Sequence, residues 1–349
     1  LINNLSAYCK VLAANFEWAE KLNSMARQAS ADRAWAAISR FYSNCKKKIP
    51  GKKGFPKFKK RVHSVEYKTT GWKLSEDRKY LTLTDGFDIG RLKLVGTYDL
   101  HFYQIKDIKR VRLVKRADGY YAQFCIAVDR EIKVEPTKRV IGLDVGLNHF
   151  YTDSDGNKVE NPRFLRKSQK ALKRLQRRVS RKFRTRTTQS NNYKKSRNKL
   201  ARKHLKVSRQ RKDFAVKLAK CVIQSNDVVA YENLQVRNMV KNHKLAKSIS
   251  DASWYLFQCW LEYFGRVYAK ITIAVPPQWT SQNCSKCGEI VTKTLSTRTH
   301  QCPHCGIVLD RDENAALNIL TKGLSTAGHV GISAWGENDL WKESGNRFR

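Results

Sequence analysis

The sequence is short of acidic residues and of long apolar runs, and each shortage excludes a class of protein. Its 349 residues include 30 Asp and Glu against 69 Lys and Arg, a formal net charge of +39. No stretch approaches the roughly 18 consecutive apolar residues of a membrane span, so we expect no membrane protein. Hydrophobic residues still make up 41% of the chain, which excludes a mainly disordered protein. This length favours two or three domains.

The positive charge predicts a polyanionic partner. Solubility needs a net charge of only about 2 to 8 for a small domain, so +39 is far in excess. Residues 161–220 hold 24 Lys and Arg and one acid, Asp213. The alternative is a solvated helix face, but such faces normally mix both signs of charge. We therefore expect nucleic-acid backbone contacts with a steep salt dependence and little sequence readout.

Hydrophobic spacing predicts the order of the elements. Apolar residues three and four apart predict helices before residue 48. Alternation around the turn Asp118-Gly119 predicts an antiparallel barrel or sheet over about 62–136. A new domain begins near residue 139, and its expected elements are a strand at 140–146, two basic helices within 161–220, buried strands at 228–232 and 271–275, and a helix opening at 310–316.

Four of the nine cysteines form two C-x-x-C pairs fourteen residues apart, Cys284 with Cys287 and Cys302 with Cys305. Four thiolates close a tetrahedral zinc site without an open position, which is typical of structural zinc. A glycine follows each pair and allows the tight turn around the metal. Redox dithiols or plain buried cysteines are the alternatives. The odd total and the spacing favour a reducing compartment over a disulfide framework, and we find no secretory signal.

Three acids occupy positions where apolar strands or a helix start are expected. Asp144 lies within an apolar strand, Glu232 ends another, and Asp310 and Asp312 precede a helix. Each has an ordinary alternative: a turn residue, a strand-exit residue, and a helix N-cap or first-turn acid. Buried acids are costly unless something charged compensates them. Two divalent metals roughly 3.5–4 Å apart would do so and would hydrolyse phosphodiesters, and oxygen ligands suit Mg²⁺ or Mn²⁺.

Taken together, six motifs resemble the TnpB (OrfB) family of insertion-sequence proteins, the compact relatives of the type V CRISPR nucleases. The motifs are Ile141–Gly146, Asn161–Arg166, Tyr231–Leu234, Ser250–Trp254, Thr280–Gly288 and Asp310–Asn318. The resemblance covers nearly the whole chain. Only the zinc block is specific by itself.

The resemblance implies an α/β fold plus a β-barrel: an RNase H-like RuvC domain with an inserted zinc ribbon, a small antiparallel wedge barrel and a helical recognition lobe. The chain opens at Leu1 without a methionine and lacks the first barrel strand of the family, so we expect an N-terminal truncation. The domains expected are a recognition lobe at 1–48, the wedge-like barrel at 49–138, RuvC at 139–278 with a basic helical insertion at about 161–222, the zinc ribbon at 279–306, the last RuvC segment at 307–325, and a flexible tail at 326–349.

The resemblance also implies the site. Asp144, Glu232 and Asp312 would be the catalytic triad holding two Mg²⁺, with Mn²⁺ as the alternative, and the family pattern favours Asp312 over Asp310. Zinc would be structural. The nucleic-acid contacts expected are Lys57, Phe58, Lys59, Arg163, Arg166, Lys173, Arg177, Arg181, Arg209 and Arg211.

The predicted function is therefore RNA-guided cleavage of DNA for a transposable element in the bacterial cytoplasm, with action at the nucleoid. The guide RNA would come from the transposon end. The recognition lobe, the barrel and the segment Phe55–Lys60 would read a short motif beside the DNA target. A transposon-associated DNA-binding regulator and a guide-independent transposase are the alternatives, and the oligomeric state stays open.

Overall fold

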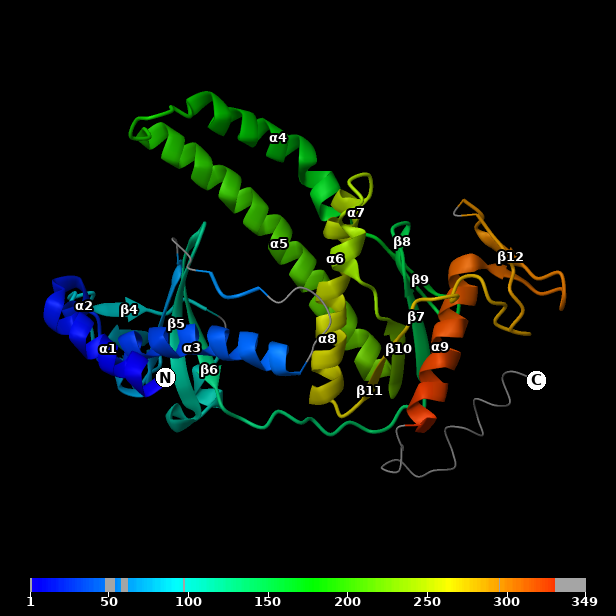
Figure 1. Cartoon of the computed structure of the whole chain (residues 1–349), viewed down its shortest axis with the longest axis horizontal. Coiled ribbons are helices and arrows are strands. Elements are labelled where there is room, and N and C mark those ends of the chain that lie inside the picture. The colour runs from blue at the N-terminus through cyan, green and yellow to red at the C-terminus, as the bar shows by residue number, and fades with distance from the viewer. Residues whose placement is uncertain (1, 48–53, 58–61, 97, 295, 330–349) are drawn as a thin grey trace. The chain divides into compact units, whose positions relative to one another are not determined.

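The computed structural model describes residues 2–47, 54–57, 62–96, 98–294 and 296–329 (Figure 1). The chain divides into two compact units, Leu1–Asp129 and Arg130–Arg349. The predicted helical lobe and strand region therefore belong to one unit. Residues 130–138, which we assigned to the strand region, belong to the other.

The first unit combines three helices with two antiparallel sheets of three strands each. One sheet has the order β1-β5-β6 and the other β2-β3-β4. The predicted hairpin at Asp118-Gly119 is confirmed, because Arg116 pairs with Gly119 across the turn. The helices are α1 (Ile2–Asn15), α2 (Glu17–Lys21) and α3 (Ser24–Lys46), and the strands are β1 (Ser64–Lys68), β2 (Trp72–Leu74), β3 (Tyr80–Leu83), β4 (Arg91–Lys93), β5 (Ile108–Arg116) and β6 (Gly119–Ile126).

A shared hydrophobic cluster explains why helices and strands form one unit here. Ala26 of α3 packs with Tyr67, Trp72, Leu81 and Val111 from the two sheets. Among the described strands, no pairing joins one of these sheets to the other. A closed barrel therefore stays a prediction.

The predicted strand region extends too far. We expected strands to about residue 136, but β6 ends at Ile126 and residues 127–139 have no regular structure. Charged and apolar residues alternate in this segment and so imitate a strand. Its backbone crosses to the second unit instead, where Ile132 N donates to Val267 O at 2.7 Å.

The second unit is built on a five-stranded sheet of order β11-β10-β7-β8-β9. Strand β7 pairs in parallel with β10, and β10 pairs in parallel with β11. Strands β8 and β9 extend the sheet as an antiparallel meander from β7. The strands are β7 (Val140–Val145), β8 (His149–Asp153), β9 (Lys158–Glu160), β10 (Val228–Glu232) and β11 (Ile271–Val275), which confirms the strands predicted at 140–146, 228–232 and 271–275. Strand β10 is buried throughout as expected, whereas on β11 only Val275 is buried.

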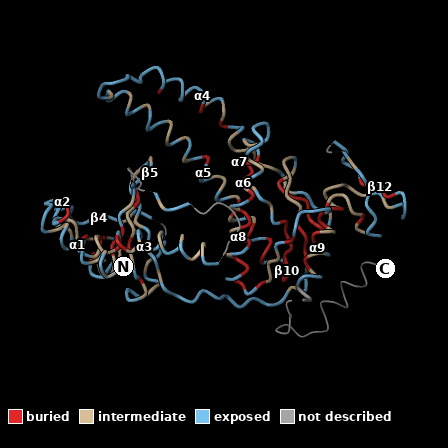
Figure 2. The backbone as a smooth tube through the Cα atoms, viewed as in Figure 1, coloured by how far each residue is buried: buried red, intermediate tan, exposed pale blue. Residues whose placement is uncertain are grey.

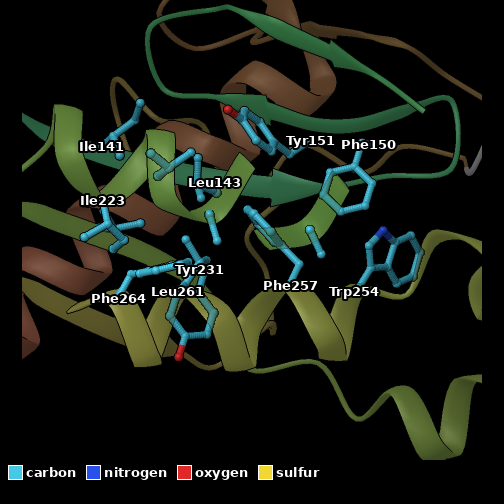
Figure 3. Close-up of a cluster of buried hydrophobic side chains, with 14 of the residues drawn as sticks. Ile141, Leu143, Phe150, Tyr151, Ile223, Tyr231, Trp254, Phe257, Leu261 and Phe264 are labelled. Carbon is cyan, nitrogen blue, oxygen red and sulfur yellow. The ribbon is translucent and has the colours of Figure 1, made fainter. Parts of the chain in front are cut away.

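Helices cover both faces of this sheet. Leu143 and Tyr231 point into a cluster with Ile223 of α5 (Asn191–Ser225) and Phe257 of α8 (Trp254–Val267) (Figure 3). Helix α9 (Arg311–His329) lies on the opposite face. It approaches so closely that a Cβ at Gly142 would stand 2.2 Å from Ala316 O. Buried residues therefore concentrate around the sheet (Figure 2).

Two long basic helices form a hairpin that extends from this unit, largely exposed (Figure 2). They are α4 (Phe164–Lys182) and α5, as the periodicity predicts. The remaining elements are η1 (Thr69–Gly71), η2 (Leu100–Phe102), η3 (Ile105–Asp107), α6 (Val236–Met239), α7 (Ala246–Ala252), β12 (Thr299–Gln301) and β13 (Val308–Asp310).

The end of the second unit differs from the expected boundary. We placed a flexible tail from residue 326, but α9 continues to His329. The rest of that predicted tail lies outside the described residues. Within the part of the chain described, no helix combines the length and apolar character that crossing a membrane requires.

Candidate active site

Strand alternation brings Asp144 and Glu232 to one face of the sheet. Gly142 and Ala230 are paired neighbours on β7 and β10, and both face α9. Because side chains alternate along a strand, Asp144 and Glu232, two residues further on, point to the same side. The register carries them to adjacent positions, since Tyr231 pairs with Leu143.

Asp312 reaches the same face from the first turn of α9. Desolvation raises the pKa of Asp144 well above its ordinary value, and the negative charges of Glu232, Asp312 and Asp310 raise it further, while Arg311 lowers it. Three chain segments far apart in sequence therefore contribute negative charge to one place.

Glu232 is held by a residue whose role the sequence analysis did not identify. Thr280, 4% exposed, donates its hydroxyl to Oε1 of Glu232 at 2.6 Å. Gln258 Nε2 donates to the Glu232 carbonyl at 2.8 Å and fixes the strand end. Burial raises the pKa of Glu232, although the Thr280 hydroxyl and the charge of Lys322 oppose it.

Asp310, the last residue of β13, and Asp312, in the first turn of α9, have different partners. Asp312 accepts from Arg311 at 2.8 and 3.0 Å, and Arg298 lies 3.8 Å away. Asp310 pairs with Lys158 at 2.7 Å and accepts from the Asp312 backbone N–H at 2.8 Å. Burial alone would raise the pKa of Asp310, but these two partners hold it below its ordinary value. Asp310 thus has the geometry of a supporting residue, consistent with the preference for Asp312.

The four cysteines meet at one point. Their four Sγ atoms all lie within 4.8 Å of one another. Among the described residues, the ligand atoms of Asp144, Glu232 and Asp312 do not form a group that tight. Sγ of Cys284 is 3.6 Å from that of Cys305, and Cys287 is 3.6 Å from Cys302. Such a cluster could hold zinc.

Both cysteine pairs share one loop geometry. The N–H of Gly288 donates to Cys284 O at 2.9 Å, and that of Gly306 donates to Cys302 O at 3.0 Å. Gly288 and Gly306 have φ of +81° and +73°, which side chains disfavour. The predicted tight turn after each pair is therefore confirmed.

Two asparagines of α9 connect this cysteine cluster to the acids. Asn314, fully buried, donates to Asn283 O at 2.8 Å and accepts from Ser285 N at 2.9 Å. Asn318 donates to Thr280 O at 2.9 Å. Both asparagines belong to the motif Asp310–Asn318, but neither role is predicted from the sequence. Their spacing of four, which puts both on one helix face, was the available signal.

Nine of the ten predicted nucleic-acid contacts fall into three groups. Lys57 and the α4 residues Lys173, Arg177 and Arg181 are exposed, as is Arg209 on α5, whereas Phe58 and Lys59 lie outside the described residues. Arg163 and Arg166 line a pocket.

Arg211 is different from the other predicted contacts, because its guanidinium binds Asp251 at 2.8 and 3.0 Å. Asp251 also accepts from the backbone N–H of Leu165 and of Arg166. Arg211 therefore holds the start of α4. Its chemistry here is an internal ion pair, which its place in a basic run did not reveal.

Two family models match separate stretches of the chain. Residues 123–243 match the OrfB_IS605 family, described as probable transposase, and residues 254–319 match the Cas12f1-like TNB domain. A putative RNA-guided DNA endonuclease of Streptomyces pristinaespiralis is 39% identical over 55% of this chain and 47% of its own length. The chain thus spans about half of that relative.

A second relative is matched over more of its length. The putative RNA-guided DNA endonuclease InsQ of Escherichia coli K12 is 29% identical over 82% of this chain and 72% of its own. The fold is similar to that in a structure of a Cas12f1–sgRNA–target DNA complex, with a TM-score of 0.52, 14% identity, and coverage of 85% of this chain and 70% of that one. These matches support the resemblance to the TnpB family that the motifs carry.

Proposed function

We propose that the chain is an RNA-guided DNA endonuclease that hydrolyses phosphodiesters at Asp144, Glu232 and Asp312. The observation that carries the proposal is the convergence of these acids on the α9 face of the sheet, where the charges of Glu232 and Asp312 raise the pKa of Asp144. The relatives named as RNA-guided DNA endonucleases support the guided activity. The net charge of +39 supports nucleic-acid partners.

The donor set fits hard divalent cations. The pKa values of Asp144 and Glu232 are raised because their charged forms are disfavoured without a cation. A doubly charged ion that prefers oxygen ligands would stabilise the three carboxylates. Asp144, Glu232 and Asp312 would hold Mg²⁺, or Mn²⁺, which would activate water and stabilise charge on the phosphate.

This chain's own residues would prepare the site. Thr280 holds one Glu232 oxygen and thereby orients the other. Arg311 neutralises the negative charge of Asp312 when no metal is bound. Arg298 lies 3.8 Å from Asp312 and is positioned to meet a phosphate at this edge. The four cysteines would hold a structural zinc. Asn314 and Asn318 would then fix the position of α9 relative to the zinc site through their hydrogen bonds.

The sheet supports an RNase H-like RuvC assignment. An antiparallel meander β7-β8-β9 followed by parallel β10 and β11, with acids on β7 and at the end of β10, is the arrangement that this assignment requires. We further propose that the first unit holds RNA as a wedge and recognition lobe. The guide RNA would derive from the transposon end, in a bacterial cytoplasm.

Cleavage of a matched DNA by the protein reconstituted with its RNA tests the proposal. Cutting that requires both the RNA and a divalent metal supports it, and loss of cutting in Asp144→Ala with RNA binding retained assigns the site. Binding without any cut would favour a DNA-binding regulator. Joining of DNA ends into a target would favour a guide-independent transposase.

A further inference from the structure

A polar pocket of about 260 Å³ opens in the second unit. It lies where the β7–β8 turn meets the first turn of α4 and helix α7, which are neighbours in Figure 1. Leu147 in its wall follows Asp144 by three residues. The lining consists of Leu147, Asn148, Asn161, Arg163, Arg166, Ser248 and Asp251.

The acid in this pocket is already neutralised. Oδ1 of Asp251 accepts from Arg211 at 2.8 and 3.0 Å, and both carboxylate oxygens accept from the Leu165 N–H, at 2.9 and 3.0 Å. Oδ2 also accepts from the Arg166 N–H at 3.1 Å. These donors already neutralise the carboxylate of Asp251, so it adds little negative charge to the pocket. The pocket keeps the positive charges of Arg163 and Arg166.

Arg163 is fixed in the pocket by its backbone. Its φ of +49° lies in the left-handed region, and Asn161 Oδ1 accepts from its N–H at 3.3 Å. Asn161 Nδ2 donates to Leu147 O at 3.0 Å and ties this segment to the β7–β8 turn. The guanidinium itself makes only 3.4 Å contacts with the carbonyls of Leu147 and Asn148. Those distances exceed a good N–H···O bond of roughly 2.7–3.2 Å, so stronger acceptors would displace them.

The donors left in the pocket match a phosphodiester. Two guanidinium groups bind phosphate oxygens in forked geometry, and the side chains of Asn148 and Ser248 add neutral donors. We infer that this pocket binds one backbone phosphate of the nucleic acid that the protein holds. The inference rests on the proposed function and adds a backbone contact to it. The phosphate would belong to the guide RNA or to the target DNA, which share this chemistry.

A chemical scan of the phosphates tests the pocket in the full-length protein with its RNA. Neutral methylphosphonates replace single linkages, in the DNA in one series and in the RNA in another. We expect one linkage in one series at which neutralisation slows cleavage about tenfold. Combining it with Arg163→Gln/Arg166→Gln should cost no more than that variant alone.

Matched variants separate a pocket from general attraction. Arg174→Gln/Arg178→Gln removes the same charge from exposed positions of the same helix, and there the methylphosphonate penalty should persist. Arg163→Lys keeps the charge without the fork and should restore binding only in part. Equal penalties at every linkage in both double variants would overturn the pocket.

The readout distinguishes this failure from failure of the proposed function. If the wild-type complex does not cut, the endonuclease proposal fails, and the same scan read as RNA and DNA affinity still tests the pocket. If it cuts and no linkage couples to Arg163 and Arg166, the pocket alone is refuted.

Discussion

The Thr280 hydroxyl and Oε1 of Glu232 are joined by a 2.6 Å hydrogen bond across 48 residues of chain. Thr280 lies on the segment leading to the cysteine cluster, and Glu232 ends a strand of the sheet. Because Asn318 binds the Thr280 carbonyl, one short segment links the helix that carries Asp312 to the strand that carries Glu232.

Thr280→Val should slow cleavage about tenfold, since a hydrogen bond to a charged group contributes roughly 1.5–3 kcal/mol. The lost donor currently lowers the pKa of Glu232, so the variant should move the acidic limb of the pH–rate profile to higher pH. Thr280→Ser retains the hydroxyl. It should restore both the cleavage rate and the wild-type position of the acidic limb. A slower variant with an unmoved limb would assign Thr280 a packing role only.

Asp144→Asn should stabilise the metal-free protein while reducing cleavage roughly a thousandfold, because metal sites supply several kcal/mol to the transition state. The folded pKa of Asp144 is raised above its ordinary 3.8. Between those two pKa values the native state binds more protons than the unfolded state, so stability falls as pH rises.

The difference in melting temperature between Asp144→Asn and wild type should therefore grow as pH rises above 3.8 in EDTA. Added Mg²⁺ should stabilise the wild type more than the variant. A pH-independent difference would contradict a strained cluster of acids.

The purified protein should contain one zinc per chain by elemental analysis. Cys302→Ser should lose it, together with cleavage, because Asn314 and Asn318 fasten the helix that carries Asp312 to the segment that begins the cluster. Cys221→Ser changes an exposed cysteine outside the cluster and serves as the control. Full activity in zinc-free protein would separate the cluster from the acids.

Asp251→Ala should destabilise the second unit by about 3–5 kcal/mol, the usual cost of leaving a buried charge without its partner. The Asp251 side chain is 7% exposed and that of Arg211 20%. The double change Asp251→Ala/Arg211→Leu removes the orphaned charge and should recover part of the loss. Urea unfolding measures both, and equal losses would show that Arg211 does not depend on Asp251.

The sequence predicted the elements with a strong period and missed what depends on distant partners. Helices α4 and α5 and strands β7, β10 and β11 follow from apolar spacing, and the turns at Gly288 and Gly306 follow from the zinc spacing. The segment 127–136 was wrong because alternation cannot distinguish a strand from an extended connection. Arg211 looked like a phosphate ligand because its partner, Asp251, lies 40 residues away.

The most direct test of the account is Mn²⁺ binding to the protein–RNA–DNA complex, followed by electron paramagnetic resonance. The account predicts that Asp144→Asn, Glu232→Gln and Asp312→Asn each lose bound Mn²⁺, while Asp310→Asn retains it. Wild-type binding in any one of the first three would show that these acids do not share a metal site.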